Sequence, residues 1–150
     1  MLCVDILVME VILMNRSYSE LIKLSTYEER FEYLKLDGRV GETTFGYDRY
    51  LNQILYRSKE WKDFRRRILI RDGGCDLAVP GYDINSRAII HHINPITVED
   101  VLNRDSKIFD PDNVITVTHQ THQAIHYGDA SLLPQAPVVR KPNDTCPWKL

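Results

Sequence analysis

The chain has 150 residues, of which 43% are hydrophobic and 27% charged, a composition typical of one folded domain rather than of a disordered protein. Its formal net charge of −2 excludes a uniformly basic nucleic-acid coat, so any contact with DNA must come from a local basic surface. The three cysteines, Cys3, Cys75 and Cys146, form no C-x-x-C pair, so neither a disulfide framework nor a cysteine zinc site is predicted. A reducing cytoplasm is the expected compartment.

The first thirteen residues, MLCVDILVMEVIL, are apolar apart from Asp5 and Glu10. They are too few to span a membrane, and no basic segment precedes them as it does in a signal peptide. Residues 1–20 are therefore treated as an uncertain leader, with two interpretations open. The segment forms a buried strand or a dimerising element, or translation begins at Met14 and the residues before it are not part of the native protein.

Residues 21–72 are predicted to be a helical and basic part of the domain. Ser25 and Glu28 fit a capping box, in which a hydroxyl and a carboxylate each satisfy a free backbone N–H. The helix that follows is expected over about 26–36, with Gly38 as a left-handed stop and a loop after it.

A second helix is expected from about Ser58 to Arg71, and a further helix before it over 47–56. In the second helix Trp61, Phe64 and Ile68 recur on one face, as in a helix that packs on a core. Seven Lys and Arg against two acidic residues give its neighbourhood, Tyr56 to Arg71, a net charge of +5.

Residues 73–130 alternate turn signals with short apolar runs. Strands are expected over 87–92 (RAIIHH) and 114–118 (VITVT), separated by a polar connection with one helical turn over 98–102. A helix then runs to a glycine cap at Gly128. The order strand, loop, strand, helix, preceded by helices, predicts an α+β fold.

The last segment, residues 131–150, holds four of the seven prolines and has little apolar periodicity. We expect an irregular, loosely ordered tail there.

All five histidines lie between His91 and His126, which suggests a metal or acid–base site. His122 and His126 are four residues apart on the last predicted helix, so both rings leave one face and can bind one ion. His91 and His92 are neighbours on a strand, so their side chains point to opposite sides. One of them can therefore join the ion while the other stays off it as a free base.

Plainer interpretations compete with this one. A lone pair of histidines four residues apart is more often a surface accident than a metal site. Gln123 follows His122, so the H-E-x-x-H motif is missing and a metallopeptidase is a distant alternative. A structural zinc site favours cysteine and does not need a fourth histidine beside the first. The strand pair and the helix pair together favour a functional site.

The order His91-His92, then Asn113 at the start of the second strand, then H-x-x-x-H at 122–126 resembles the HNH endonuclease motif on a ββα-metal fold, the His-Me finger. Other segments between about residues 40 and 130 resemble the small HNH proteins of bacteriophages: TFGYDRYLNQ, SKEWKDFR, RDGGCDL, PGYDI, HHINPIT and THQAIHYGD. The resemblance implies a ββα-metal catalytic core over 73–130, with N-terminal helices and an irregular C-terminal tail.

The resemblance also implies a role for each residue of the motif. His92 would be the general base that takes a proton from water, and Asn113 would tether a loop and orient that base. His91, His122 and His126 would bind one divalent metal ion, either Mg, Mn, Ni or Zn. His119, the fifth histidine, has no role in the motif.

Two C-x-x-C pairs hold a structural zinc in many HNH proteins, and here Cys75 stands alone, so no structural zinc is expected. The resemblance implies a metal-dependent DNA endonuclease, phage-encoded and acting in the cytoplasm of a bacterial host, with DNA and phage packaging proteins as partners and no membrane. A non-catalytic, metal-stabilised DNA-binding module or packaging accessory is the alternative.

The basic helix is the second indication of nucleic acid. A solvated helix face is the plain interpretation of such a run of charge. Beside a site that cleaves phosphodiesters, however, a cationic stripe can position phosphates. The candidates for contacts to the DNA backbone are Lys59, Lys62, Arg65 and Arg66.

Overall fold

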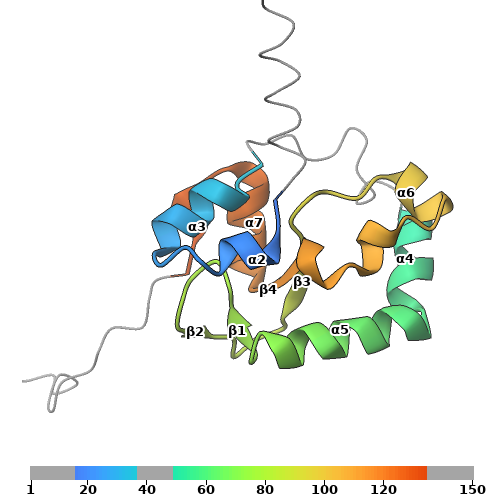
Figure 1. The fold of residues 1–150 in the computed structure, drawn as a ribbon, viewed down its shortest axis with the longest axis horizontal. Helices are drawn as coiled ribbons and strands as arrows, with labels where there is room; N and C mark the ends of the chain where they lie inside the picture. The colour runs from blue at the N-terminus through green and yellow to red at the C-terminus, as the bar shows by residue number, and fades with distance from the viewer. Residues whose placement is uncertain (1–15, 37–48, 135–150) are drawn as a thin grey trace, which may run out of the picture.

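The computed structural model describes residues 16–36 and 49–134 of the chain (Figure 1). They form a mixed α+β fold with two small antiparallel sheets, which confirms the predicted fold class at that level. The leader up to residue 15, the glycine stop at Gly38 and the tail beyond residue 134 lie outside the described residues. Among the described helices, none is both long and apolar enough to cross a membrane.

Two short helices, α2 (Tyr18–Leu21) and α3 (Tyr27–Leu34), open the described part of the chain. Arg16 donates hydrogen bonds to the carbonyl oxygens of Leu34 and Lys35 at the end of α3. Leu21 is fully buried in the core beside Leu34. The fold therefore includes residues ahead of the expected boundary at residue 21.

The capping box of α3 lies one residue later than predicted. The hydroxyl of Thr26 accepts from the N–H of Glu29, and the carboxylate of Glu29 accepts from the N–H groups of both Thr26 and Ser25. Two overlapping boxes fit this sequence, and the later one satisfies two backbone donors with one carboxylate. The pair of Ser25 and Glu28 is therefore not the one used.

Helices α4 (Arg49–Arg57) and α5 (Lys59–Arg71) follow, and the hydroxyl of Ser58 caps α5 by accepting from the N–H of Trp61. The expected helix from Ser58 to Arg71 is thus confirmed, with Ser58 as its cap. At the end of α5 Gly73 and Gly74 have φ of 63° and 69°, a backbone region that glycine adopts without strain.

The two sheets are short. Strands β1 (Cys75–Asp76) and β2 (Tyr82–Asp83) pair antiparallel, and the sequence did not predict them because two residues carry no periodicity. Strands β3 (Ile89–His92) and β4 (Val114–Val117) also pair antiparallel, within the ranges expected for both.

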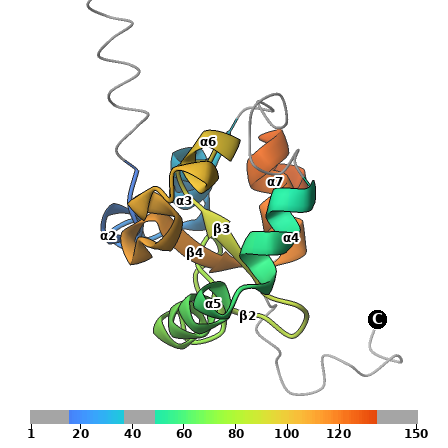
Figure 2. The same cartoon turned by 90° about the vertical axis from the view of Figure 1, so that its right-hand side faces the viewer.

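The two faces of the β3–β4 pair meet different helices. Ile115 and Val117 pack in one cluster with Ile125 of α7 (His119–Tyr127), while Ile90 and Val114 pack in another with aromatic and aliphatic side chains of α5. In Figures 1 and 2 α5 lies below the strand pair, and α3 and α7 lie above it. Successive side chains of β3 therefore enter opposite halves of the molecule.

The connection from β3 to β4 contains α6 (Val98–Leu102), as predicted, and two 3₁₀ turns, Ser106–Phe109 and Pro111–Asn113. Helix α7 begins after Thr118, whose hydroxyl accepts from the N–H of Thr121. It ends at a left-handed Gly128, which confirms the expected glycine cap.

Candidate functional site

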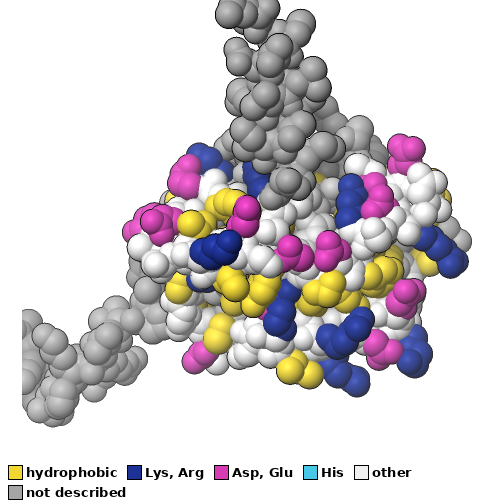
Figure 3. Space-filling view, viewed as in Figure 1, with side chains coloured by type: hydrophobic (Ala, Val, Ile, Leu, Met, Phe, Trp, Pro, Cys, Tyr) yellow, Lys and Arg dark blue, Asp and Glu magenta, His cyan; other side chains and the backbone are white. Residues whose placement is uncertain are grey.

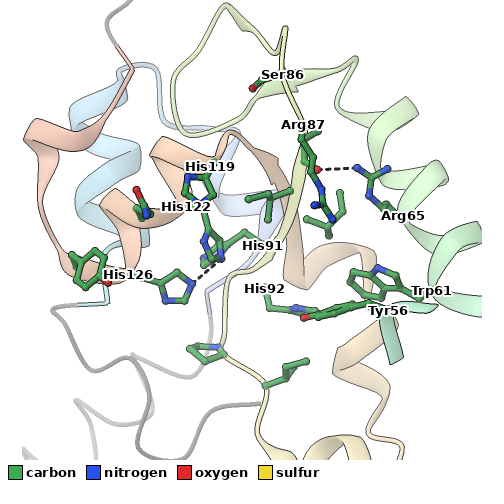
Figure 4. Close-up of a pocket in the computed structure, with 17 residues that line it drawn as sticks. Tyr56, Trp61, Arg65, Ser86, Arg87, His91, His92, His119, His122 and His126 are labelled. Carbon is green, nitrogen blue, oxygen red and sulfur yellow. Dashed lines mark hydrogen bonds between the residues drawn. The ribbon is translucent and has the colours of Figure 1, made fainter. Parts of the chain in front are cut away.

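His91 of β3 meets His122 and His126 of α7 on one side of β3 (Figure 4). The ring centroid of His91 lies 5.4 Å from that of His122 and 5.2 Å from that of His126, and the two helix rings are 4.3 Å apart. One nitrogen of each ring lies within 4.8 Å of the other two. This group of three, predicted from the sequence, can hold one metal ion.

Two nitrogen atoms of the cluster lack the partners that a purely structural role requires. The Nε2 of His91 and the Nδ1 of His126 are buried with no hydrogen-bond partner. The Nε2 atoms of His122 and His126 are 3.0 Å apart, so a proton on one of them makes a hydrogen bond, and a cation between the rings would replace that proton. Ligand nitrogens on a tetrahedral zinc ion are about 3.3 Å apart, so the side chains fit a divalent ion with small adjustments.

Burial keeps these imidazoles in the form that binds a metal. Burial, and then repulsion from His126 and His122, lowers the pKa of His91 well below its usual range. Burial, and then the neighbouring His126 and His119, lowers the pKa of His122 to about 4, and burial lowers the pKa of His126. The three rings are therefore neutral at pH 7, and their lone pairs are available to a cation.

A buried carboxylate fixes the start of α7. Asp76 of β1 is fully buried and accepts from the N–H groups of Ala78 and Thr118, each at 3.0 Å, and from the hydroxyl of Thr121. The helix that carries His122 is thereby held against the β1–β2 pair. Sequence reasoning missed Asp76, because nothing local distinguishes it from a surface aspartate.

His92 lies on the other side of β3, as strand alternation predicts (Figure 4). Its ring stacks on Trp61 of α5, with centroids 5.7 Å apart and an interplanar angle of 29°. Its Nε2 lies 3.0 Å from the carbonyl oxygen of Ile108, which can only accept, so Nε2 carries the proton and Nδ1 is the basic nitrogen. Burial lowers the pKa of His92, so the ring is neutral at pH 7.

Asn113 holds the connection that faces His92. Its Oδ1 accepts from the backbone and side-chain N–H groups of Asn94 at 2.9 and 2.8 Å. Its Nδ2 donates to the carbonyl oxygen of Lys107 at 3.1 Å. Lys107 precedes Ile108, the residue that accepts from His92. The structure therefore places Asn113 one residue away from the group that fixes the His92 ring.

Both sets of histidines line one pocket of about 870 Å³ (Figure 4). Two arginines, Arg65 and Arg87, line it as well, and no Asp or Glu within residues 16–36 and 49–134 does. Arg65 is anchored by a hydrogen bond of 2.8 Å to the carbonyl oxygen of Ala88. Arg87 is exposed, and its place five residues before His92 was the only sign of it in the sequence. A pocket with this lining suits an anion.

The four predicted DNA contacts all lie on α5, and one of them lines the pocket. Arg65 lines the pocket, whereas Lys59, Lys62 and Arg66 are exposed on α5 and do not line it. Lys59 forms an exposed ion pair with Asp63 at 2.8 Å. Figure 3 shows Lys and Arg side chains along α5 at the lower edge of a face on which no histidine is visible. Only Arg65 is therefore brought beside the histidines.

Comparisons with known proteins assign no family to the chain. No protein-family model, no curated protein and no solved structure gives a significant match. The function is therefore inferred from the side chains of the site: three imidazoles that can share an ion, a fourth that can accept a proton, and two arginines that line the same pocket.

Proposed function

We propose that the protein is a metal-dependent DNA endonuclease of the HNH type, with a ββα-metal core formed by β3, β4 and α7. The observation that carries the proposal is the division of two neighbouring histidines. His91 lies with two further imidazoles, while His92 lines the same pocket from the other side of the strand with one basic nitrogen. Hydrolysis of a phosphodiester needs a base for water and positive charge for the phosphate, and this arrangement supplies a place for each.

The three histidines would hold the ion. When bound, a divalent cation stabilises negative charge on the phosphate and on the departing oxygen. All three donors are neutral nitrogens, so they would leave the cation its full charge toward the substrate. Imidazole donors favour Zn and Ni over Mg and Mn, which prefer oxygen ligands.

His92 would carry out the proton transfer. Its Nε2 donates to the carbonyl oxygen of Ile108, and this bond fixes the tautomer in which Nδ1 accepts. In the proposed step Nδ1 takes a proton from water as the water oxygen bonds to phosphorus. The bond from phosphorus to the leaving oxygen then breaks, and that oxygen takes a proton from solvent. His92 returns its own proton to solvent and is ready for another cycle.

The substrate is proposed to be DNA because the site and its surroundings select for anions. Arg65 and Arg87 line the pocket, and none of the acidic side chains that the structure describes lines it with them. The exposed Lys59, Lys62 and Arg66 on α5 would contact phosphates farther from the cut, where they add affinity without reading sequence.

The alternative function is a non-catalytic, metal-stabilised DNA-binding module. The observation in its favour is the burial of His92, which is 8% exposed, stacked on Trp61 and bonded to a backbone carbonyl. A structural histidine is held in the same way. The two functions differ in whether His92 accepts a proton from water.

The test compares the wild-type protein with the His92→Ala and His92→Gln variants. Each is incubated with supercoiled plasmid and Mg, Mn, Ni or Zn, and metal affinity is measured separately by titration. We expect nicking by the wild type and a loss of about 100- to 10,000-fold in both variants, with metal affinity retained. If the wild type converts no plasmid with any of these ions, the endonuclease proposal is wrong. Equal rates in all three proteins would remove His92 as the base.

A further inference from the structure

A second hollow lies beside the pocket over the histidines. This hollow has a volume of about 220 Å³, and the described residues that line it carry uncharged or imidazole side chains: Tyr82, Asn85, Ser86, Thr118, His119 and Gln120. Ser86 and His119 line both hollows. The two hollows are therefore neighbours at the start of α7, between the loop that precedes β3 and the first turn of the helix.

Helix α7 lines the first pocket with two rows of side chains. His122 and His126 form the row that can hold an ion. His119, Gln123 and Tyr127 form the second row, in which successive members are four residues apart in sequence and so lie about one turn apart. Within the described part of the chain, none of these three side chains makes a hydrogen bond. Tyr127, at the far end, is 66% exposed.

The two rows extend to different lengths along the helix. The second row begins one turn before His122, at the junction with the second hollow, and ends at Tyr127 beyond His126. A ligand held at the ion-binding row can therefore continue past it in both directions. Such a path suits a chain that is cut internally, and a small phosphate monoester would leave both ends unused.

The chemistry of the lining also selects the ligand. Of the residues that the structure describes, no Asp or Glu lines either hollow. Amide, hydroxyl and imidazole groups such as Asn85, Ser86 and His119 can bond to phosphate, sugar and base edges alike. Exposed aromatic rings such as Tyr127 provide a surface on which a base can stack.

We propose that the two hollows form one groove that binds a continuous nucleic-acid strand on both sides of the phosphate over the histidine cluster. His119 and Asn85 contact the nucleotides on one side of that phosphate, and Tyr127 stacks on a base on the other side. The inference rests on the endonuclease function proposed above, and it gives His119 a role in binding the strand rather than the metal.

The first test measures binding apart from catalysis. The His92→Ala protein, with and without zinc, is titrated into a fluorescein-labelled single-stranded oligodeoxynucleotide of about 16 nucleotides, and anisotropy gives the Kd. Adding His119→Ala, Asn85→Ala or Tyr127→Ala should raise the Kd by about 3- to 10-fold each, because each removes one hydrogen bond or one stacked base. Asn103→Ala is the matched control, since Asn103 is exposed on the α6 side and lines neither hollow. Metal affinity should stay unchanged in His119→Ala.

The second test assigns the contacts to one side of the cut. Substrates shortened from either end are compared in the wild type and in His119→Ala. Removing the nucleotides that His119 contacts should raise the KM of the wild type, and should add little in the variant, which has already lost that contact. Shortening the opposite end should affect both proteins equally, and the reverse pattern is expected for Tyr127→Ala.

The outcomes separate this inference from the function on which it rests. If plasmid is cut but the His119 and Asn85 variants bind the oligonucleotide like the control, the groove proposal is wrong and the endonuclease proposal is retained. If no metal supports cutting but the same variants bind more weakly, the groove proposal is retained and the endonuclease proposal is wrong. A wild-type protein that binds no oligonucleotide overturns the groove directly.

Discussion

The two faces of β3 place a histidine side chain in two different environments. On the face toward α7, His91 meets His122 and His126, and its Nε2 is buried without a partner. On the face toward α5, the ring of His92 is stacked on Trp61 and bonded through Nε2. Binding a cation requires several lone pairs that converge and stay unsatisfied by protein. Accepting a proton requires one ring held in one tautomer.

Strand geometry makes this separation possible between two residues that are adjacent in the sequence. Successive side chains of a strand leave on opposite faces, so His91 and His92 enter different clusters although they share a peptide bond. A helix could not do this with adjacent residues, because neighbours there diverge by only part of a turn. Because the two faces use different residues, substitutions can disturb one face and leave the other unchanged.

The largest expected effect comes from removing a histidine donor on the α7 face alone. His126→Ala removes one of three donors and should lower the affinity for Zn or Ni by about 100-fold or more. Nicking of plasmid should fall with the occupancy of the metal. Isothermal titration measures the affinity, and Trp fluorescence reports the α5 face, which should not change because Trp61 contacts His92 and not His126. Retained affinity would show that the ion does not bind at this cluster.

Loosening the α5 face without touching His92 should have the next largest effect. Asn113→Ala leaves the N–H of Asn94 and the carbonyl of Lys107 without their partner, and should cost about 2–4 kcal/mol of unfolding free energy. The rate of cleavage should fall further than the remaining folded fraction explains, because the chain that carries Ile108 is no longer held. Chemical denaturation and single-turnover rates measure the two effects, and metal affinity per folded molecule should stay constant.

Acid should lower the unfolding free energy of the metal-free protein, because the α7 face contains buried neutral imidazoles. The pKa of His122 is about 4 in the folded protein and about 6.5 when exposed, so the unfolded chain binds the proton first. Stability is therefore complete above about pH 6.5 and falls as the pH drops toward 4, by at most about 3 kcal/mol from this residue. Thermal melts of the chelator-treated protein at several pH values measure the slope. The His122→Gln variant should have a shallower slope, and an equal slope would contradict the prediction.

The smallest effect is expected at the outer stripe of α5, away from both faces of β3. Lys62→Ala should change the unfolding free energy by less than about 0.5 kcal/mol, because the side chain is exposed. It should weaken DNA binding about equally for all sequences and reduce the salt dependence by about one ion. Binding measured at several salt concentrations tests this. An unchanged salt dependence would remove this part of the stripe from the DNA interface.

The predictions that succeeded from sequence are those that depend on local spacing. Two histidines four residues apart share a helix face wherever that helix lies, and adjacent strand residues separate whatever packs on them. For this reason spacing predicted that one of His91 and His92 would join His122 and His126 and the other would not, and the family resemblance pointed to His91 as the one that joins them. The start of α5 and the end of α7 could also be predicted, because Ser58 and Gly128 are local capping signals.

What could not be predicted depends on contacts between distant parts of the chain. Ile108 accepts from His92 through a backbone carbonyl, a group that every residue has, so no sequence pattern distinguishes it. Arg87 enters the pocket because of the path of the loop before β3. The capping box failed for a different reason, since two overlapping boxes satisfy the same pattern. DNA, phage packaging proteins and the identity of the metal stay predictions.

The hydrogen bonds of Asp76 have a consequence for how a metal ion would exchange at the three histidines. The start of α7 is held by a carboxylate that accepts from Thr118 and Thr121, and none of these oxygen atoms is changed by mild oxidants or by chelators. The helix that supplies two of the three donors is therefore held in place by contacts that do not involve an ion. A cation that binds there would exchange reversibly at a preformed site, and we expect no refolding step in that exchange.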